Sequence, residues 1–237
     1  MFFNNLRHSI GTLMLILIIS SCGGKANEVT PEVIEKAQVM FYNGGSTESY
    51  YALNDKKVTD PLGLATSSNY VSIEYTPTNV NAIKLKSSTG ADVISQAIIP
   101  KNSGVYSFFT WRKPLTGGAQ TYGSIMVEDS LSAPATGKVK IRAAIMNRDG
   151  GAAYDIIAAD ANQNQTKIFE NVSLGNVTSF KEMNAGTYRF TFFGASGSFN
   201  FGNVQNIKLE AGKIYTLATS NKIMGSIDVS ADLITNK

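Results

Sequence analysis

Apolar and polar residues alternate with a period of two along much of the chain, which is the pattern of half-buried β-strands. In the run TYRFTFF at 187–193, Tyr188, Phe190 and Phe192 fall on one face of such a strand. Glycine-containing turn sequences separate the runs, at 43–46, 88–91, 148–151, 184–187 and 210–213. Short strands at this spacing, with no convincing helical stripe between them, predict an all-β fold of the sandwich type.

Two phrases of the sequence are nearly the same. GSIMVEDSL at 123–131 and GSIDVSADL at 225–233 share five of nine positions. Three further similarities occur in the same order, between 37–43 and 139–147, 61–73 and 173–183, and 98–110 and 207–219. An ordered series of matches predicts that one unit of about 100 residues, a usual domain size, occurs twice.

The repeat predicts the domain organisation. We expect two tandem antiparallel β-sandwiches, at 37–132 and 137–237, and expect each to end in the repeated phrase as its last strand. Residues 133–136 form the linker, because 132–137 (SAPATG) consists of small residues with one proline and one glycine.

The N-terminus has the layout of a secretory signal peptide over residues 1–21. Arg7 and His8 precede an apolar core at 13–19, which is much shorter than the ~20 residues of a membrane-spanning helix. The core leads into Ile-Ser-Ser-Cys, which resembles a bacterial lipobox ending at Cys22. That resemblance implies cleavage before Cys22, diacylation of its sulfur and acylation of its new amine.

Several acyl chains on one residue hold a protein firmly, because each buried CH₂ contributes about 0.8 kcal/mol. Residues 22–36 are therefore expected to be a lipid-anchored tether, which extends at most ~50 Å. Gly23, in place of an aspartate, resembles the sorting signal of outer-membrane lipoproteins. We expect a cell-envelope protein, and specifically an outer-membrane lipoprotein in the periplasmic or surface leaflet, whose membrane contact is the lipidated Cys22.

The composition narrows the possible chemistry. Cys22 is the only cysteine and His8 the only histidine, so the mature chain has no disulfide and no histidine. A Ser-His-Asp triad and a histidine-ligated zinc site are excluded on this ground. Once Arg7 is removed, the net charge is close to neutral with no basic run, which argues against nucleic-acid binding. We expect no cofactor and no metal.

The second half of the chain carries a family resemblance. VSLGNVTSFKEMNAGTYRFTFF at 172–193, followed by IKLEAGKIYTLAT at 207–219, resembles the bacterial domain-of-unknown-function 4397 family. The resemblance covers most of 139–221 and implies an immunoglobulin- or transthyretin-like sandwich on exported proteins. It brings no catalytic residues. The first copy is a degenerate relative, which lacks AGTY and has PKNSGVY in place of LEAGKIY.

The segment 160–171 (DANQNQTKIFEN) is a candidate calcium loop. Asp160, Asn162 and Asn164 match positions one, three and five of an EF-hand loop. Position six is Gln165 where the loop requires glycine, and Glu170 falls at position eleven where twelve is required. The alternative, which we favour, is a polar hairpin turn held by Asx side chains.

An aromatic strand offers a candidate glycan site. If Tyr106 and Tyr215 are equivalent core residues, Phe108 also faces the core, while Phe109 and Trp111 face outward. An exposed Phe and Trp side by side would stack on a sugar ring. We favour the alternative, that they are covered by the second domain or a loop, because large aromatic side chains are usually buried.

Tyr50 and Tyr51 form a second candidate aromatic pair of the same kind. Glu128 and Asp129 are the only adjacent acids, but neighbours on a strand point to opposite faces, and we expect surface acids. Asp129-Ser130-Leu131 resembles a short bacterial O-glycosylation motif, which leaves glycosylation of Ser130 open.

Together these features predict a non-enzymatic function. We expect a protein-interaction or structural module of the cell envelope. A glycan-binding surface module, with Phe109 and Trp111 as its support, is the first alternative. A carboxylate-based hydrolase, which needs two acids at a set separation, is the second.

Overall fold

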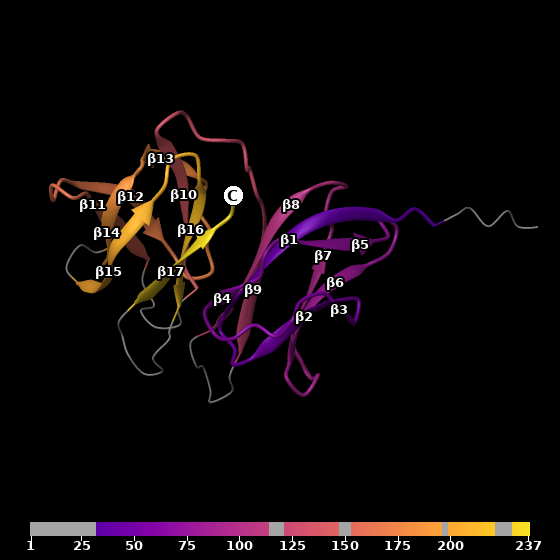
Figure 1. The fold of residues 1–237 in the computed structure, drawn as a ribbon. Helices are drawn as coiled ribbons and strands as arrows, with labels where there is room; N and C mark the ends of the chain where they lie inside the picture. The colour runs from indigo at the N-terminus through magenta and orange to yellow at the C-terminus, as the bar shows by residue number, and fades with distance from the viewer. Residues whose placement is uncertain (1–31, 114–120, 147–152, 196–198, 221–228) are drawn as a thin grey trace, which may run out of the picture. The chain divides into compact units, whose positions relative to one another are not determined.

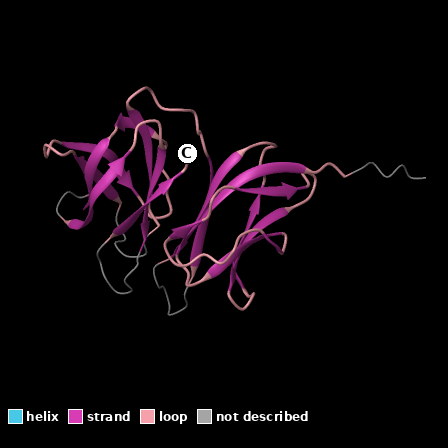
Figure 2. Cartoon of the chain, in the orientation of Figure 1, coloured by secondary structure: helices cyan, strands magenta, loops and turns pink. Residues whose placement is uncertain are grey.

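The computed structural model describes residues 32–113, 121–146, 153–195, 199–220 and 229–237. Within these residues the chain forms seventeen strands and no helix, so the all-β prediction is confirmed (Figure 2). The strands are β1 (Glu35–Gly44), β2 (Ser49–Leu53), β3 (Lys56–Lys57), β4 (Thr66–Ser67), β5 (Val71–Tyr75), β6 (Asn81–Ser87), β7 (Asp92–Ile98), β8 (Val105–Arg112), β9 (Tyr122–Glu128), β10 (Lys138–Ala144), β11 (Tyr154–Ala159), β12 (Gln165–Val172), β13 (Lys181–Asn184), β14 (Gly186–Gly194), β15 (Asn200–Leu209), β16 (Ile214–Ser220) and β17 (Ser230–Thr235).

Strands β1 to β9 form two sheets that share one hydrophobic core, and we call them the N-terminal sheet pair (Figure 1). The first sheet has the order β4-β1-β8-β9, with β5 also paired to β1, and the second has the order β3-β2-β6-β7. Alternate residues of β1, β2, β5, β6 and β8 face this core, as the period of two requires. Its largest completely buried side chains are Phe41, Tyr51, Ile73, Ile83 and Phe108.

Strands β10 to β17 form two further sheets around a separate core, and we call them the C-terminal sheet pair. The third sheet has the order β13-β10-β16-β17, and the fourth has the order β12-β11-β14-β15. Aromatic side chains from the fourth sheet fill much of this core. Tyr154 lies 6.5 Å from Phe192 and 5.3 Å from Phe201, measured between ring centroids, in edge-on arrangements.

The two sheet pairs have the same strand order, and each contains one parallel ladder. β1 pairs with β8 in parallel, and β10 pairs with β16 in parallel. The prediction of antiparallel sheets is wrong at these two ladders. Parallel neighbours need a long crossover connection, and here the strands of the partner sheet supply it.

Tyr106 and Tyr215 make the same contact in the two sheet pairs. The Tyr106 hydroxyl accepts a hydrogen bond from the backbone N–H of Lys101 at 2.8 Å, and the Tyr215 hydroxyl accepts one from Glu210 at 3.1 Å. Each donor lies five residues upstream of its tyrosine. The two halves therefore share this local contact as well as their strand order.

The repeated phrase does not occupy equivalent places in the two ladders. β9 contains most of the first phrase, and Tyr106 pairs with Glu128. In the second ladder Tyr215 pairs with Thr235, which lies beyond the second phrase, and residues 225–228 lie outside the described residues. The two halves are therefore aligned better by their strand order and by Tyr106 and Tyr215 than by the repeated phrase.

The boundaries also differ in detail from those expected. β1 begins at Glu35, inside the predicted tether. The predicted linker 133–136 precedes β10 without forming a strand.

Candidate functional site

A third hydrophobic cluster, here the interface cluster, joins the outer faces of the first and third sheets. Its buried members are Met40, Tyr42, Phe109, Ala144, Met146, Ala218 and Ile234. In β1 the interface residues alternate with residues of the N-terminal core. Both faces of this strand are thus buried, which explains its nearly continuous apolar sequence.

A buried ion pair lies at this interface. Arg142 on β10 donates from Nη1 to Asp129 Oδ1 at 2.6 Å, and Asp129 directly follows β9. The two side chains are only 2% and 0% exposed, respectively. Removing two charges from water costs several kcal/mol per ion, so such a pair is stable only when further hydrogen bonds satisfy both groups.

Those further bonds are present around the arginine. Arg142 Nε donates to Thr216 Oγ1 at 2.9 Å, and Arg142 Nη2 donates to Ser107 Oγ at 2.8 Å. The Ser107 hydroxyl in turn donates to Asp129 Oδ2 at 2.6 Å. Ser107 lies on β8 and Thr216 on β16, so the guanidinium binds both sheet pairs.

The chain of hydrogen bonds closes into a ring. Tyr70 donates from its hydroxyl to Asp129 Oδ2 and accepts from Asn236 Nδ2 at 3.0 Å. Thr216 Oγ1 donates to Asn236 Oδ1 at 2.7 Å and so returns the chain to Arg142. Burial, together with the neighbouring Asp129 charge, raises the pKa of Tyr70, which keeps its hydroxyl protonated as a donor. We call Tyr70, Ser107, Asp129, Arg142, Thr216 and Asn236 the interface network.

Aromatic rings cover the guanidinium of Arg142. Its central carbon lies 4.5 Å from the ring centroid of Phe180 and 5.6 Å from that of Phe109. Cation–π contacts strengthen when they are desolvated, as this one is. Phe109 is itself completely buried.

Trp111 packs between glycines of the two sheet pairs. A methyl group at Gly123 on β9 would lie 2.3 Å from Trp111 Cε2, and one at Gly175, between β12 and β13, would lie 2.5 Å from Cζ2. Gly175 also has a φ of +79°, a conformation that favours glycine. The absence of side chains at both positions lets the indole fit against the interface cluster.

The aromatic strand therefore differs from the glycan site considered in the sequence. Tyr106 and Phe108 belong to the N-terminal core, and Phe109 and Trp111 face away from it, as the alternation predicts. The exposed pair that a glycan site requires is not present, because the third sheet covers Phe109, which is completely buried. Trp111 is partly buried in the same cluster, so both residues follow the alternative that we favoured.

Tyr50 and Tyr51 separate in the same way. Tyr51 is completely buried, stacks on Phe41 with ring centroids 4.6 Å apart, and donates from its hydroxyl to the Tyr42 carbonyl at 2.9 Å. Burial raises the pKa of Tyr51. Tyr50 is half-buried, and the Lys57 ammonium lies 5.5 Å from its ring centroid. The structure does not bring these two rings together as one exposed face.

The candidate calcium segment forms a hairpin turn between β11 and β12. Asp160 Oδ1 accepts from the backbone N–H groups of Asn162 and Asn164, both at 2.9 Å, and Oδ2 accepts from Asn164 Nδ2 at 3.0 Å. These bonds, led by the Asn164 side chain, lower the pKa of Asp160. Its carboxylate is thus occupied by the turn. Across the described residues no group of three His, Cys, Asp or Glu side chains is placed to hold a metal ion.

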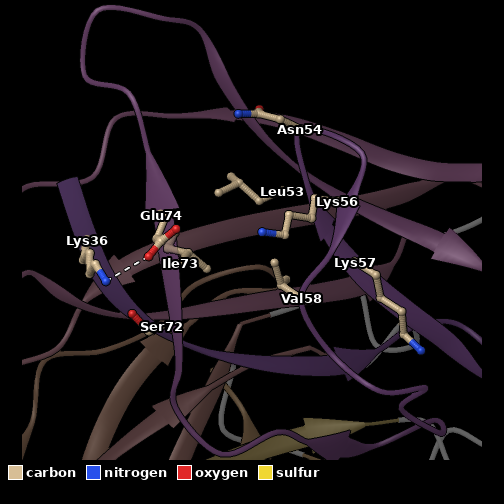
Figure 3. A pocket seen from close by; sticks show the side chains of 9 residues that line it. All are labelled: Lys36, Leu53, Asn54, Lys56, Lys57, Val58, Ser72, Ile73 and Glu74. Atoms are coloured by element: carbon tan, nitrogen blue, oxygen red, sulfur yellow. Dashed lines mark ion pairs between the residues drawn. The ribbon is translucent and has the colours of Figure 1, made fainter. Parts of the chain in front are cut away.

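A cleft with a volume of about 680 Å³ opens beside the N-terminal core, between β5 and the β2–β3 hairpin (Figure 3). Its lining residues are Lys36, Leu53, Asn54, Lys56, Lys57, Val58, Ser72, Ile73 and Glu74. Lys36 and Glu74 form an ion pair at 2.8 Å on its wall. The pKa of Glu74 is lowered mainly by the Lys36 ammonium, and the charge of Lys56 contributes further.

The lining of this cleft does not contain the pair of acids that glycoside hydrolysis uses. Figure 3 shows the Lys57 amine pointing away from the other lining side chains. Among the lining residues Glu74 is the only acid, whereas hydrolysis of a glycoside requires two carboxyl groups in one cleft.

The adjacent acids Glu128 and Asp129 have opposite environments. Glu128 is exposed and pairs with Lys101 at 2.7 Å, whereas Asp129 is buried in the interface network. The expectation of a surface acid is therefore wrong for Asp129. Ser130, which follows it, is exposed.

Cys22 and the signal peptide lie outside the described residues.

Sequence reasoning missed the interface network. One signal was present, because Arg142 is the only charged residue in the apolar run 141–146. A charge inside an otherwise buried strand implies a partner, although the sequence does not identify which acid supplies it.

No described residue belongs to a helix that is long and apolar enough to cross a membrane.

Residues 149–237 match the family model described as Domain of unknown function (DUF4397). This match supports the resemblance seen in the sequence and falls within the C-terminal half of the chain. Comparison with curated proteins found no match. The family model attaches no activity to the C-terminal sheet pair.

One similar solved structure is a leucine-rich repeat protein from Bacteroides thetaiotaomicron VPI-5482. The two are 12% identical with a TM-score of 0.21 over 77% of this chain. This chain spans 25% of the length of that protein.

Proposed function

We propose that this protein is a non-catalytic lipoprotein of the bacterial cell envelope, and that it acts as a structural or protein-interaction module. Acylated Cys22 anchors it, and Gly23 directs it to the outer membrane. The support for the anchor is the basic start, the short apolar core and the lipobox-like residues before Cys22.

The module consists of two tandem sandwiches of immunoglobulin- or transthyretin-like type, each with one parallel ladder. Their common strand order and the shared contact of Tyr106 and Tyr215 support this organisation. The family match to 149–237 covers much of the second copy, which agrees with a degenerate first copy.

The observation that carries the structural role is the interface network. Three side chains that were candidates for binding or catalysis instead join the two sheet pairs, together with Arg142. They are Phe109, Trp111 and Asp129. A buried ion pair often adds little net stability, and in some proteins it fixes a defined geometry instead. A module that presents surfaces at a fixed spacing needs such a joint.

The anchor is tested by growing cells with an alkyne fatty acid and fractionating their membranes. The full-length protein should carry the label and sediment with outer membranes. Cys22→Ala should lose the label and appear in the soluble fraction. A wild-type protein without label would contradict the proposal.

Gly23→Asp is the matched control, because it keeps the cysteine and changes only the next residue. It should retain the label and move to the inner-membrane fraction. If it stays in the outer membrane, the sorting signal is wrong, although the anchor remains.

A further inference from the structure

Exposed aliphatic side chains gather at one end of the N-terminal sheet pair. Among the described residues, five large apolar side chains are strongly exposed, and four of them are Val33 (62%), Ile34 (61%), Val80 (85%) and Ile99 (95%). The fifth, Phe199, directly precedes β15 in the C-terminal half of the chain. We call the four residues the apolar rim.

The ladders place two of these residues opposite each other. Asn81 pairs with Ile98 in the antiparallel ladder of β6 and β7. Val80 precedes Asn81 and Ile99 follows Ile98, so the two occupy the next position beyond the end of this ladder.

The start of β1 lies at the same end. Glu35 pairs with Tyr75 at the end of β5. The Tyr75 hydroxyl oxygen lies 2.7 Å from Glu35 Oε2 and 3.0 Å from the Pro100 carbonyl oxygen, and the two acceptors share its one proton. Pro100 directly follows Ile99, and Ile34 directly precedes Glu35. Figure 1 shows the chain entering β1 where β5 ends.

The charges around the rim are paired. Lys36 binds Glu74 at 2.8 Å, and Lys101 binds Glu128 at 2.7 Å. Glu35 accepts the Tyr75 hydroxyl and keeps its negative charge. The charges of the two ion pairs cancel, and the remaining negative charge does not attract an anionic surface, so an apolar contact is favoured here over an electrostatic one.

The segment between Cys22 and Val33 limits the distance between the apolar rim and the membrane. Val33 lies eleven residues after Cys22, a separation of at most about 40 Å when fully extended. The acyl chains on Cys22 therefore hold this end of the sheet pair close to a bilayer. Clustered exposed apolar residues on soluble proteins mark contact surfaces, and a lipid surface is the one that the tether brings within reach.

We propose that the apolar rim contacts the surface of the bilayer in which Cys22 is anchored, and so orients the module on the membrane. This inference rests on the proposed lipid anchor. Val80 and Ile99 enter the boundary between headgroups and acyl chains, where apolar faces bury to a depth of about 5–10 Å.

The test uses the full acylated chain carrying Ile99→Cys, labelled with an environment-sensitive NBD dye. Cys22 is the only natural cysteine, so once it is acylated the introduced thiol is the only one that reacts. The protein is reconstituted in phosphatidylethanolamine–phosphatidylglycerol vesicles. Emission should shift to the blue, and lipids that carry a doxyl quencher in the acyl chain should quench it.

Ser88→Cys is the matched control. Ser88 is exposed in the hairpin at the opposite end of the β6–β7 ladder, about 23 Å away along seven residues of strand. Its label should keep an aqueous emission and be quenched several-fold less by the doxyl lipids. Equal quenching at positions 88 and 99, on protein that floats with the vesicles, would overturn the inference while leaving the anchor intact.

Two other outcomes are distinguishable. A blue shift at position 99 without quenching by doxyl lipids would mean that a protein covers the rim, and would also overturn the inference. Labelling of the wild-type chain at Cys22, or failure to float, would instead show that the proposed anchor is wrong.

Discussion

Removal of the Arg142 guanidinium is the sharpest perturbation of the joint between the sheet pairs. Arg142→Met keeps a long side chain under Phe109 and Phe180 but leaves the Asp129 carboxylate buried without its cation. Breaking a buried pair by removing one partner costs about 3–5 kcal/mol. Asp129 retains two donors, Tyr70 and Ser107, and we therefore expect a loss of about 3 kcal/mol.

The assay is urea unfolding followed by circular dichroism, with every chain carrying Cys22→Ala so that lipid does not differ. Asp129→Asn and the double variant complete a mutant cycle. Because the two groups interact directly, the double variant should be less destabilised than the sum of the single variants, by about 1–3 kcal/mol.

Lys101→Met is the matched control, because it removes the cation of Glu128, the immediate neighbour of Asp129. That pair is exposed, with side chains 73% and 54% accessible, and exposed pairs contribute about 0.2–1 kcal/mol. A loss of under about 1 kcal/mol for Arg142→Met, or additive single effects, would refute the role given to the interface network.

Three further changes test neighbouring parts of the structure. Trp111→Ala should lower the free energy of unfolding by about 3 kcal/mol, the low end for truncating a buried aromatic, because the indole fills the space between two glycines; unchanged urea unfolding would mean that the ring does not pack there. Tyr215→Phe should cost about 1 kcal/mol in the same assay, since it removes the hydroxyl that accepts the Glu210 N–H and nothing else. The pKa of Asp155 is lowered mainly by the Lys167 ammonium and further by the Asn171 N–H. The ionised carboxylate therefore stabilises the fold above its unfolded pKa of about 3.9, and this stability is lost as the pH falls through the lower folded pKa. Asp155→Asn should therefore flatten the decrease in melting temperature between neutral and acidic pH, and an unchanged pH profile would contradict this assignment.

Much of the fold follows from local patterns in the sequence. The period of two in 187–193 corresponds to β14, and the facing of Tyr106 and Phe108 follows from the same alternation. The turn at 160–164 follows from its Asx residues, because their hydrogen bonds are local. Such features depend on residues close together in the chain.

The candidate site depends on distant contacts and was not predictable in the same way. Asp129, Arg142, Thr216 and Asn236 come together only when β9, β10, β16 and the C-terminal residues are paired and the outer faces of two sheets meet. Whether Phe109 is exposed was not predictable from its strand alone. Alternation determines on which face of the strand a side chain lies, but not whether another element covers that face. The parallel ladders also escaped prediction, since each joins strands about seventy residues apart.

The interface cluster and the interface network join the two sheet pairs, and we claim that the pairs therefore unfold as one cooperative body. Trp111 is the only tryptophan in the sequence and lies in the interface cluster, so its fluorescence reports on this joint directly. Urea unfolding of the mature chain should give coincident transitions by Trp111 fluorescence and by far-UV circular dichroism, as expected for all-or-none unfolding. A fluorescence change that is complete before the sheets unfold would show that the pairs separate independently, and would contradict the claim.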